Sequence, residues 1–466
     1  MRKVVLIVGV LALCLFGGAL SAQTSSVKMS KAGNQLAAGI PETGKKLTSR
    51  QIVEYLASDA LEGRYPGTKG DTLASSFIQK QFEALGLKTS LQPFGIKKDS
   101  CTTFNVIGIL KETADKYIVV GAHYDHLGYG GAGSGSRRPD TVAVHNGADD
   151  NASGVAAMLH LAKRYTIMNH AEQPFAGKSG RVHTAQGRRG QLTAADTAMA
   201  LSPSVGIIFV AFGAEERGVI GSKEFAEHPP VAREKIMAMF NFDMVGYLRG
   251  GAITLGGTGT AKELDSLIDI SIAAFNNQRP FALRSGKHST EGVPVKVQKS
   301  KEGVGPSDHA SFYARNIPVA YFSTGATLDY HTPEDDACKL NYGGIDSVAN
   351  FASVLLNYVA TQPSLTFTEA GSPNAGPMRA SFKVTLGLMP DVTGQVENGL
   401  RADIVIKGKP AHNAGLKNGD IITKINENDV TDIESYMKCL GTLKAGEIAK
   451  IKVSRGEQVL LFDVQL

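Results

Sequence analysis

Histidines and carboxylates gather where short apolar runs of the chain end. They follow four runs of strand length and precede one helix: His123 and Asp125 after 117–121, Glu215 and Glu216 after 206–212, Asp243 after 236–240, Asp329, Tyr330 and His331 after 318–323, and Asp149 and Asp150 before a helix that begins near 155. Open α/β sheets bind ligands outside the carboxyl ends of their strands. Carboxylates crowded into one crevice repel each other unless a cation neutralises them. The pattern therefore predicts a cation site at one edge of a sheet.

The types of side chain in this set suit zinc or a similar borderline ion. Imidazoles and carboxylates are present, and no pair of cysteines with CxxC spacing accompanies them. The set is large enough for two ions about 3.5–4 Å apart that share a carboxylate and a water. A lone HxD motif or Glu-Glu pair is more often structural or solvated, so the prediction rests on all the segments together.

Strand-like runs alternate with helical patterns in the part of the chain that carries these groups. The four apolar runs have strand length, and apolar residues over 155–165 mark one face of a helix between the first two. This alternation predicts an α/β fold with a mixed, mostly parallel central sheet flanked by helices. The region 47–87 has a helical pattern, and the polar stretches 130–138 and 166–204 are typical of surface insertions.

The N-terminus has the pattern of a secretory signal. Arg2 and Lys3 precede the apolar run Val4–Phe16, and small residues follow up to Ala22. We therefore expect cleavage near Ala22 and an exported protein, periplasmic or extracellular. A short membrane anchor is one alternative, but the run is too short to span a bilayer. A lipid attached at Cys14 is another, but Leu13 before it fits a lipid-attachment site poorly.

The remaining sequence divides into two folded units and their connections. We expect a flexible lead-in over 23–46, a large unit over 47–361, a linker over 362–379, and a small unit over 380–466. The net charge of +5 is too small and too evenly spread to indicate nucleic-acid binding. No apolar stretch reaches the roughly 20 residues of a stable membrane span.

Cysteine usage gives no sign of a disulfide framework. Cys14 would leave with the signal, so Cys101, Cys338 and Cys439 remain. Three thiols permit one bridge at most, and we favour free or buried thiols.

The segments GAHYDH, GADDNASG, AEERG, NFDMVG, SDHASF and YHTPEDD occur in this order along the chain. The series resembles the co-catalytic zinc aminopeptidases, the aminopeptidase Y type of clan MH, which are related to glutamate carboxypeptidase. The resemblance covers roughly 47–361. It implies the zinc exopeptidase fold, two zinc ions per chain, and hydrolysis of N-terminal residues from peptide substrates.

The resemblance also assigns five metal ligands. It implies that His123 and Asp243 bind one zinc, that Glu216 and His331 bind the other, and that Asp150 bridges both.

Further roles follow from the same resemblance. Asp125 would hold the His123 ring, Glu215 would be the general base that takes a proton from a metal-bound water, and Tyr330 would stabilise the oxyanion. His126 is a spare imidazole that we expect to support the site or to be solvated.

The acidic and polar neighbours of these residues receive supporting roles. We expect Asp149 to cap or orient, and Asp308 and His309 to make structural hydrogen bonds. Asp335 and Asp336 are expected to pair with backbone groups or arginine.

Two other functions fit parts of this pattern. A glutaminyl cyclase, an acyltransferase with one zinc on the same fold, is the first alternative. Such enzymes line their pocket with tryptophan, whereas this chain has none and carries Tyr330 before the last histidine. An inactive scaffold is the second alternative, although all five ligands and the base are present.

The small C-terminal unit resembles a PDZ domain. The stretch PAHNAGLKNGDIITKIN over 410–426 matches the signature of bacterial members, and Leu386-Gly387-Leu388 would be the carboxylate-binding loop. The resemblance implies an α+β unit that captures the C-terminus of a peptide or protein through backbone N–H groups and a strand edge. A module that only packs on the larger unit is the alternative.

Overall fold

The computed structural model describes residues 47–96, 99–172, 201, 204–277, 294–370, 384–390, 398–405, 408–417 and 419–466. The expected signal over 1–22, the lead-in over 23–46, and most of the 166–204 insertion lie outside these residues, as does the linker from 371 to 379. Within the described ranges, no helix combines the length and apolar character needed to cross a bilayer.

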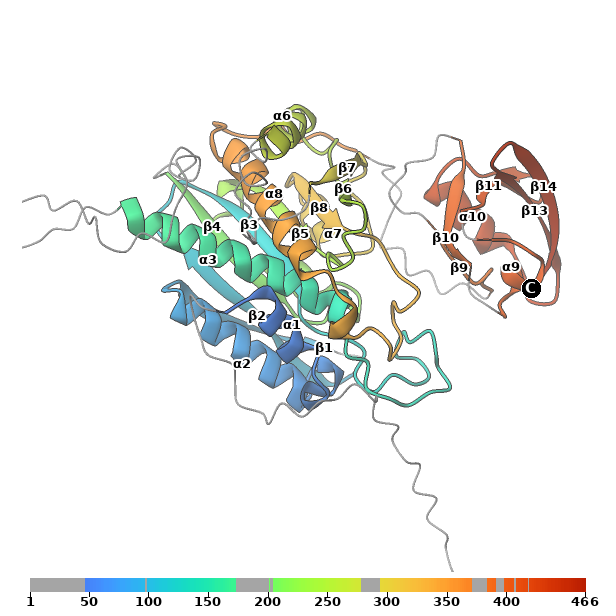
Figure 1. The fold of residues 1–466 in the computed structure, drawn as a ribbon, viewed down its shortest axis with the longest axis horizontal. Helices are drawn as coiled ribbons and strands as arrows, with labels where there is room; N and C mark the ends of the chain where they lie inside the picture. Colours follow the sequence, from blue (N-terminus) through green and yellow to red (C-terminus); the bar gives the residue numbers. More distant parts are fainter. Residues whose placement is uncertain are drawn as a thin grey trace, which may run out of the picture.

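The larger unit contains eight strands and seven α-helices among the described residues (Figure 1). In chain order they are α1 (Ser49–Leu56), α2 (Lys69–Ala84), β1 (Lys88–Ile96), β2 (Cys101–Leu110), β3 (Lys116–His123), α3 (Gly154–Glu172), β4 (Val205–Phe212), α5 (Ile220–Glu227), β5 (Ile236–Phe242), β6 (Ala252–Gly256), α6 (Leu264–Asn277), β7 (Lys296–Lys299), α7 (His309–Tyr313), β8 (Val319–Ser323) and α8 (Tyr342–Ala360).

The four predicted strands form the centre of the sheet. The strand order is β1-β2-β4-β3-β5-β8-β6-β7, and the neighbours β4, β3, β5 and β8 run parallel. Every residue of β4, β5 and β8 is buried, which explains why these strands read as unbroken apolar runs. Since parallel neighbours end at the same edge, the residues after these four strands are brought together there.

Helices cover both faces of this sheet. One core joins α1, α2, α3, α6 and α8 to the sheet, and a second core packs Phe225 of α5 and Phe312 of α7 against the opposite face. Figure 1 shows α3 and α8 lying across the same face, in agreement with their mutual contacts. The prediction of an α/β fold with a mixed, mostly parallel sheet is confirmed.

The structure departs from the predicted pattern at both ends of the larger unit. The helical pattern over 47–87 is divided into α1 and α2, because the intervening Gly63 has a φ of 69° and lies against the Gly128 carbonyl, where a Cβ would come within 2.4 Å of the oxygen. The first part of the expected linker packs on this unit, with the Lys262 N–H donating to the Thr366 carbonyl at 3.0 Å.

The C-terminal unit is a small sheet with two helices in its described part. Its elements are β9 (Leu388–Pro390), β10 (Leu400–Val405), α9 (Pro410–Asn413), β11 (Ile421–Ile425), β12 (Asn428–Asp429), α10 (Ile433–Thr442), β13 (Ile448–Arg455) and β14 (Gln458–Gln465). All its strand pairs are antiparallel, in the order β14-β13-β11-β10-β9. Its own apolar core includes Leu386, Ile422, Ile451 and Val453. The expected small α+β unit is confirmed.

Candidate active site

The carboxyl ends of the central strands hold the predicted residues in one place. His123 is the last residue of β3, Asp243 directly follows β5, and Glu215 and Glu216 lie in the turn after β4. His331 lies in the loop between β8 and α8. The remaining group, Asp150, sits in the turn over Ala148–Ser153 that leads into α3.

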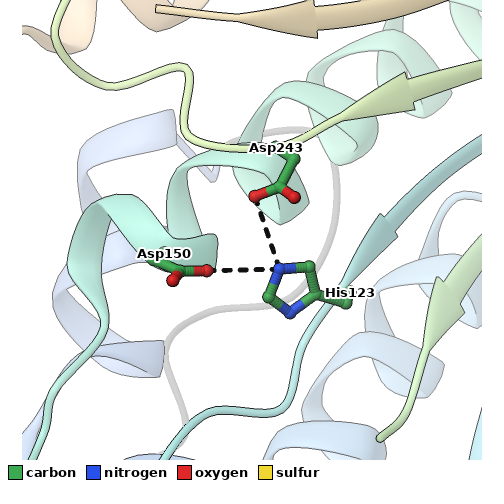
Figure 2. Close-up of side chains that lie close together, drawn as sticks. All are labelled: His123, Asp150 and Asp243. Atoms are coloured by element: carbon green, nitrogen blue, oxygen red, sulfur yellow. Dashed lines mark ion pairs between the residues drawn. The ribbon is translucent and has the colours of Figure 1, made fainter. Parts of the chain in front are cut away.

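Two groups of side chains share the carboxylate of Asp150. The His123 Nε2 lies 3.2 Å from Asp150 Oδ1 and 3.4 Å from Asp243 Oδ1 (Figure 2). The His331 Nε2 lies 3.1 Å from both the other oxygen of Asp150 and the Glu216 Oε1. Each oxygen of Asp150 therefore faces a different histidine, as a bridging ligand requires.

The separations between these atoms fit a pair of zinc ions. Tetrahedral zinc with bonds of 2.0–2.1 Å to nitrogen and oxygen places neighbouring ligand atoms about 3.3 Å apart. The four nitrogen–oxygen distances above lie between 3.1 and 3.4 Å. The donor set, imidazole and carboxylate without thiolate, suits a borderline divalent cation.

A third imidazole joins the second group. His126 is fully buried, and its Nδ1 lies 3.0 Å from Glu216 Oε1. One ligand atom each of His126, Asp150 and Glu216 fall within 4.8 Å of one another. The suggestion that His126 is solvated is wrong, because this ring is fully buried and lies edge-on to the His331 ring, with 5.8 Å between their centroids.

The Asp335 carboxylate holds the main chain of the bridging residue Asp150. The carboxylate of Asp335 accepts hydrogen bonds from the N–H groups of Asp149 and Asp150, both at 3.0 Å. Asp149 in turn accepts from the Gly246 N–H at 2.7 Å. The expected orienting role of Asp149 and the pairing of Asp335 with backbone groups are both observed. The Asp150–Asn151 peptide bond is cis.

Asp125 connects the end of β3 to the turn after β4. Its carboxylate accepts hydrogen bonds from the Glu215 N–H at 2.9 Å and the Glu216 N–H at 3.2 Å. The closest partner of the His123 Nδ1 is the Asp125 carbonyl oxygen at 3.2 Å, whereas the nearer carboxylate oxygen is 3.7 Å away. The residue expected to hold this ring therefore does so mainly through its main chain.

The neighbours Glu215 and Glu216 have opposite protonation tendencies. Burial raises the pKa of Glu215 well above its usual value, and the nearby negative charges of Glu216 and Asp308 add to this effect. Burial would also raise the pKa of Glu216, but the His331 charge overcomes it and lowers the pKa to about 2. Such a divergence separates a proton-carrying carboxyl from an ionised ligand.

The histidines respond to the same carboxylates. Burial would lower the pKa of His123, but Asp243 and Asp150 raise it well above its usual value. A cation bound at these nitrogens competes with that proton, so its binding must release protons.

Tyr330 lies beside the second group. Its ring stacks on the His331 ring, with centroids 3.8 Å apart and planes at 19°. Burial raises the pKa of this phenol, and the charges of Asp150 and Glu216 raise it further. The hydroxyl therefore stays protonated and able to donate a hydrogen bond at neutral pH.

Asp308 directly precedes α7, His309 is the first residue of that helix, and both are buried. Burial raises the pKa of Asp308 to about 7, with the His123 charge acting against it. The His309 ring stacks on Tyr321, with 4.4 Å between the centroids. Neither residue belongs to the two ligand groups.

Sequence reasoning missed Arg64, which supports the site. Arg64 is fully buried and donates hydrogen bonds to four main-chain carbonyls, those of Leu56, Tyr124, Asn146 and Gly147. It thereby joins the turn after α1 to both ligand-bearing loops. Only its position in a glycine- and proline-containing turn could have drawn attention to it.

Comparison with known proteins identifies the family of the larger unit. Residues 105–356 match the family model described as Peptidase family M28. This chain belongs to peptidase family M28. Residues 389–466 match the PDZ domain model, so the C-terminal unit is a PDZ domain. The buried His/Asp/Glu groups that share Asp150 are consistent with the binuclear metal site of this family of metallopeptidases.

Curated relatives of this M28 chain are distant. It is 26% identical over 312 residues to leupeptin-inactivating enzyme 1 of Streptomyces exfoliatus, covering 66% of this chain and 54% of the relative. It is 26% identical over 244 residues to aminopeptidase YwaD of Bacillus subtilis, covering 50% of this chain and 40% of the relative. The chain thus spans about half the length of these relatives.

Solved structures with a similar fold include two kinds of enzyme. An aminopeptidase from Aneurinibacillus sp. strain AM-1 is 16% identical, with a TM-score of 0.45 over 69% of this chain and 94% of its own. A glutaminyl cyclase from Porphyromonas gingivalis is 19% identical, with a TM-score of 0.48 over 66% of this chain and 96% of its own.

Proposed function

We propose that this M28 protein is an exported, zinc-dependent aminopeptidase that removes N-terminal residues from peptides. The observation that carries the proposal is the shared carboxylate of Asp150 between two histidine-containing groups, with Glu215 next to the ligand Glu216. Zinc ions held by His123, Asp150, Asp243, Glu216 and His331 would lower the pKa of a shared water and polarise the peptide carbonyl.

Glu215 is the proposed proton carrier. It is nearly buried, and its raised pKa brings the carboxyl toward the operating pH, where proton transfer in both directions is efficient. Glu215 accepts the proton of the attacking water and donates it to the leaving amine. Asp125 holds the main chain of Glu215 through the 2.9 Å hydrogen bond and so fixes the backbone position from which the Glu215 side chain extends.

Tyr330 and the acidic cluster are proposed to recognise the substrate. The neutral phenol of Tyr330 supplies a hydrogen-bond donor for the oxyanion of the tetrahedral intermediate. The substrate's α-ammonium group would pair with the carboxylates at the strand ends, which restricts cleavage to the residue that carries a free amino group.

The PDZ domain and the N-terminal signal pattern complete the proposal. We propose that the PDZ domain binds the C-terminus of a peptide or protein at β9, which stands at the end of the described sheet order and follows Gly387 with its φ of 70°. The signal pattern over 1–22 supports export to the periplasm or outside the cell.

Glu215→Gln tests the proposed mechanism. We expect the variant to keep two zinc ions per chain and to lose about 10²–10⁴-fold in kcat, since general acid–base catalysis contributes that much. Zinc would be measured by mass spectrometry of the purified protein, and turnover with a panel of amino-acid p-nitroanilides. Glu227→Gln, an exposed ion-pair partner of Arg315, is the matched control and should retain full activity.

Three outcomes would redirect the proposal. Near-normal activity of Glu215→Gln would show that another group carries the proton. One zinc per chain together with cyclisation of N-terminal glutamine would identify a glutaminyl cyclase. Failure of the fully zinc-loaded protein to act on any substrate would favour a scaffold that works through its PDZ domain.

A further inference from the structure

The polar insertion over 130–138 lies against the loop that carries His331. Within it, residues 135–138 contact 327–334, although nearly 200 positions separate the two segments in the sequence. Arg138 pairs with Glu334 at 2.7 Å at the exposed end of this contact. We call residues 135–137, which contact the stretch 327–331, the clamp segment; Arg138 lies outside it.

The clamp segment is itself anchored to the loop that follows β3. The Ser136 Oγ lies 2.8 Å from the His145 Nε2, and the other ring nitrogen of His145 contacts the Ala143 carbonyl at 2.9 Å. The main-chain N–H of His145 donates to the Gly128 carbonyl at 2.8 Å. The insertion is therefore a folded part of the larger unit with fixed internal partners.

Its first contact orients the imidazole ring of His331. The Nδ1 of His331 lies 3.0 Å from the Gly135 carbonyl oxygen. A carbonyl can only accept, so the ring must donate from Nδ1, and the Nε2 lone pair is left for a cation. That Nε2 is the atom that faces Asp150 and Glu216.

Its second contact holds the main chain of His331. This residue has a φ of 56°, in the left-handed region that non-glycine residues seldom adopt. Such a conformation persists only where the surroundings determine it. The main-chain N–H of Arg137 donates to the His331 carbonyl at 2.9 Å, and the Ser136 hydroxyl approaches the same oxygen at 3.5 Å.

Its third contact gathers the loop in front of His331. The Arg137 Nη1 lies 3.3 Å from the Leu328 carbonyl oxygen, and 3.5 Å from the carbonyl oxygens of Thr327 and Tyr330. The Arg137 guanidinium therefore contacts three carbonyl oxygens of the loop, and the last of them belongs to Tyr330, directly before His331.

We propose that the clamp segment positions His331 and that Arg137 thereby sets the affinity of the second cation site. Arg137 is a positioning residue that acts through the loop and does not touch the cation. The first site, formed by His123, Asp150 and Asp243, does not use this loop. The inference rests on the proposed metal site and is independent of which bond the enzyme cleaves.

The test compares Arg137→Met, Arg137→Lys and the control Arg138→Met. Zinc retained per chain is measured across a series of chelator concentrations, and cobalt absorption spectra report the coordination of each site. We expect Arg137→Met to keep its first ion while the affinity of the second falls about 10–100-fold, the usual effect of losing an outer partner of a ligand. Arg137→Lys should recover part of the loss, and Arg138→Met should match the unaltered protein.

Activity provides an independent readout of the same effect. The lost turnover of Arg137→Met should return when zinc is in excess, with little change in KM. Unaltered affinity for both ions in Arg137→Met would overturn the inference, as would an equal loss in Arg138→Met. If Arg137→Met does not fold, Arg137→Lys is the deciding variant. Lysine cannot contact several carbonyls at once as the guanidinium does, so unchanged affinity for the second cation in Arg137→Lys would also overturn the inference. An unaltered protein that binds no pair of ions would instead refute the proposed metal site.

Discussion

Replacing Arg64 by methionine should destabilise the larger unit more than any exposed substitution. The guanidinium is fully buried and donates to four carbonyls at 2.5–2.9 Å. Burial lowers the pKa of Arg64 to about 10, so the group remains charged at neutral pH beside Asp125 and Asp150. Methionine keeps much of the side-chain volume but removes every donor and the charge.

The expected loss follows from the four hydrogen bonds and the cost of burying the charge. Hydrogen bonds to a charged group contribute about 1.5–3 kcal/mol each, so four would contribute roughly 6–12 kcal/mol. Desolvation of a buried ion offsets several kcal/mol of this, and breaking such a group's contacts typically costs about 3–5 kcal/mol. We therefore expect Arg64→Met to lower the free energy of unfolding by about 3–5 kcal/mol, a large part of the 5–15 kcal/mol typical of a domain.

Urea unfolding monitored by far-ultraviolet circular dichroism measures this loss, because the chain has no tryptophan to report it by fluorescence. Arg50→Met is the matched control. Arg50 is exposed, pairs with Glu54 at 3.3 Å and lies 4.1 Å above the Tyr342 ring, so its loss should cost less than about 1 kcal/mol. If Arg64→Met unfolds within 1 kcal/mol of the unaltered protein, the four carbonyls do not depend on the guanidinium and the reasoning is refuted.

Two further substitutions test the ligand group and the PDZ domain. His126→Leu removes the 3.0 Å contact with Glu216 and should weaken zinc binding at the second site about 10–100-fold in chelator competition; unchanged affinity would show that Glu216 needs no such partner. In the PDZ domain, burial would raise the pKa of Asp420, but its bonds from Arg455 lower it. A lowered carboxyl pKa stabilises the fold above the unfolded value near 3.9 and loses this effect as the pH falls through the folded value. Asp420→Asn should therefore cost about 1–2 kcal/mol at pH 7, and the difference should shrink below about pH 4. Hydrogen exchange of the β11 and β13 amides at several pH values measures it, and a pH-independent difference would contradict the assignment.

The centre of the fold could be predicted because its signal is local. The strands β3, β4, β5 and β8 are buried on both faces, so each appears as an apolar run that needs no knowledge of its neighbours. The outer pair β1 and β2 was not predicted. Along β1 most residues are exposed or half-buried, and no apolar run marks the strand.

The ligand groups could be predicted for a related reason. Parallel strands end at one edge, so chemically distinctive residues after β3, β4 and β5 must lie near each other whatever the details of the loops. The order of the segments then allowed individual roles to be assigned by resemblance. What the order did not reveal is the inward turn of His126, because its position depends on the path of a loop and not on the strand that precedes it.

The contacts that orient the two histidine rings escaped prediction because their acceptors are main-chain carbonyls, although the supporting roles of Asp125, Asp149 and Asp335 were expected. The ring of His123 contacts the Asp125 carbonyl, and the ring of His331 contacts the Gly135 carbonyl. Any residue type supplies a carbonyl, so the sequence at these acceptors carries no trace of the contact. The positions of these carbonyls depend instead on side chains that bind the main chain nearby. Arg64 binds the loop after β3, and Arg137 binds the loop that carries His331. Substitution of these arginines should therefore disturb metal binding even though neither guanidinium contacts the side chain of a ligand.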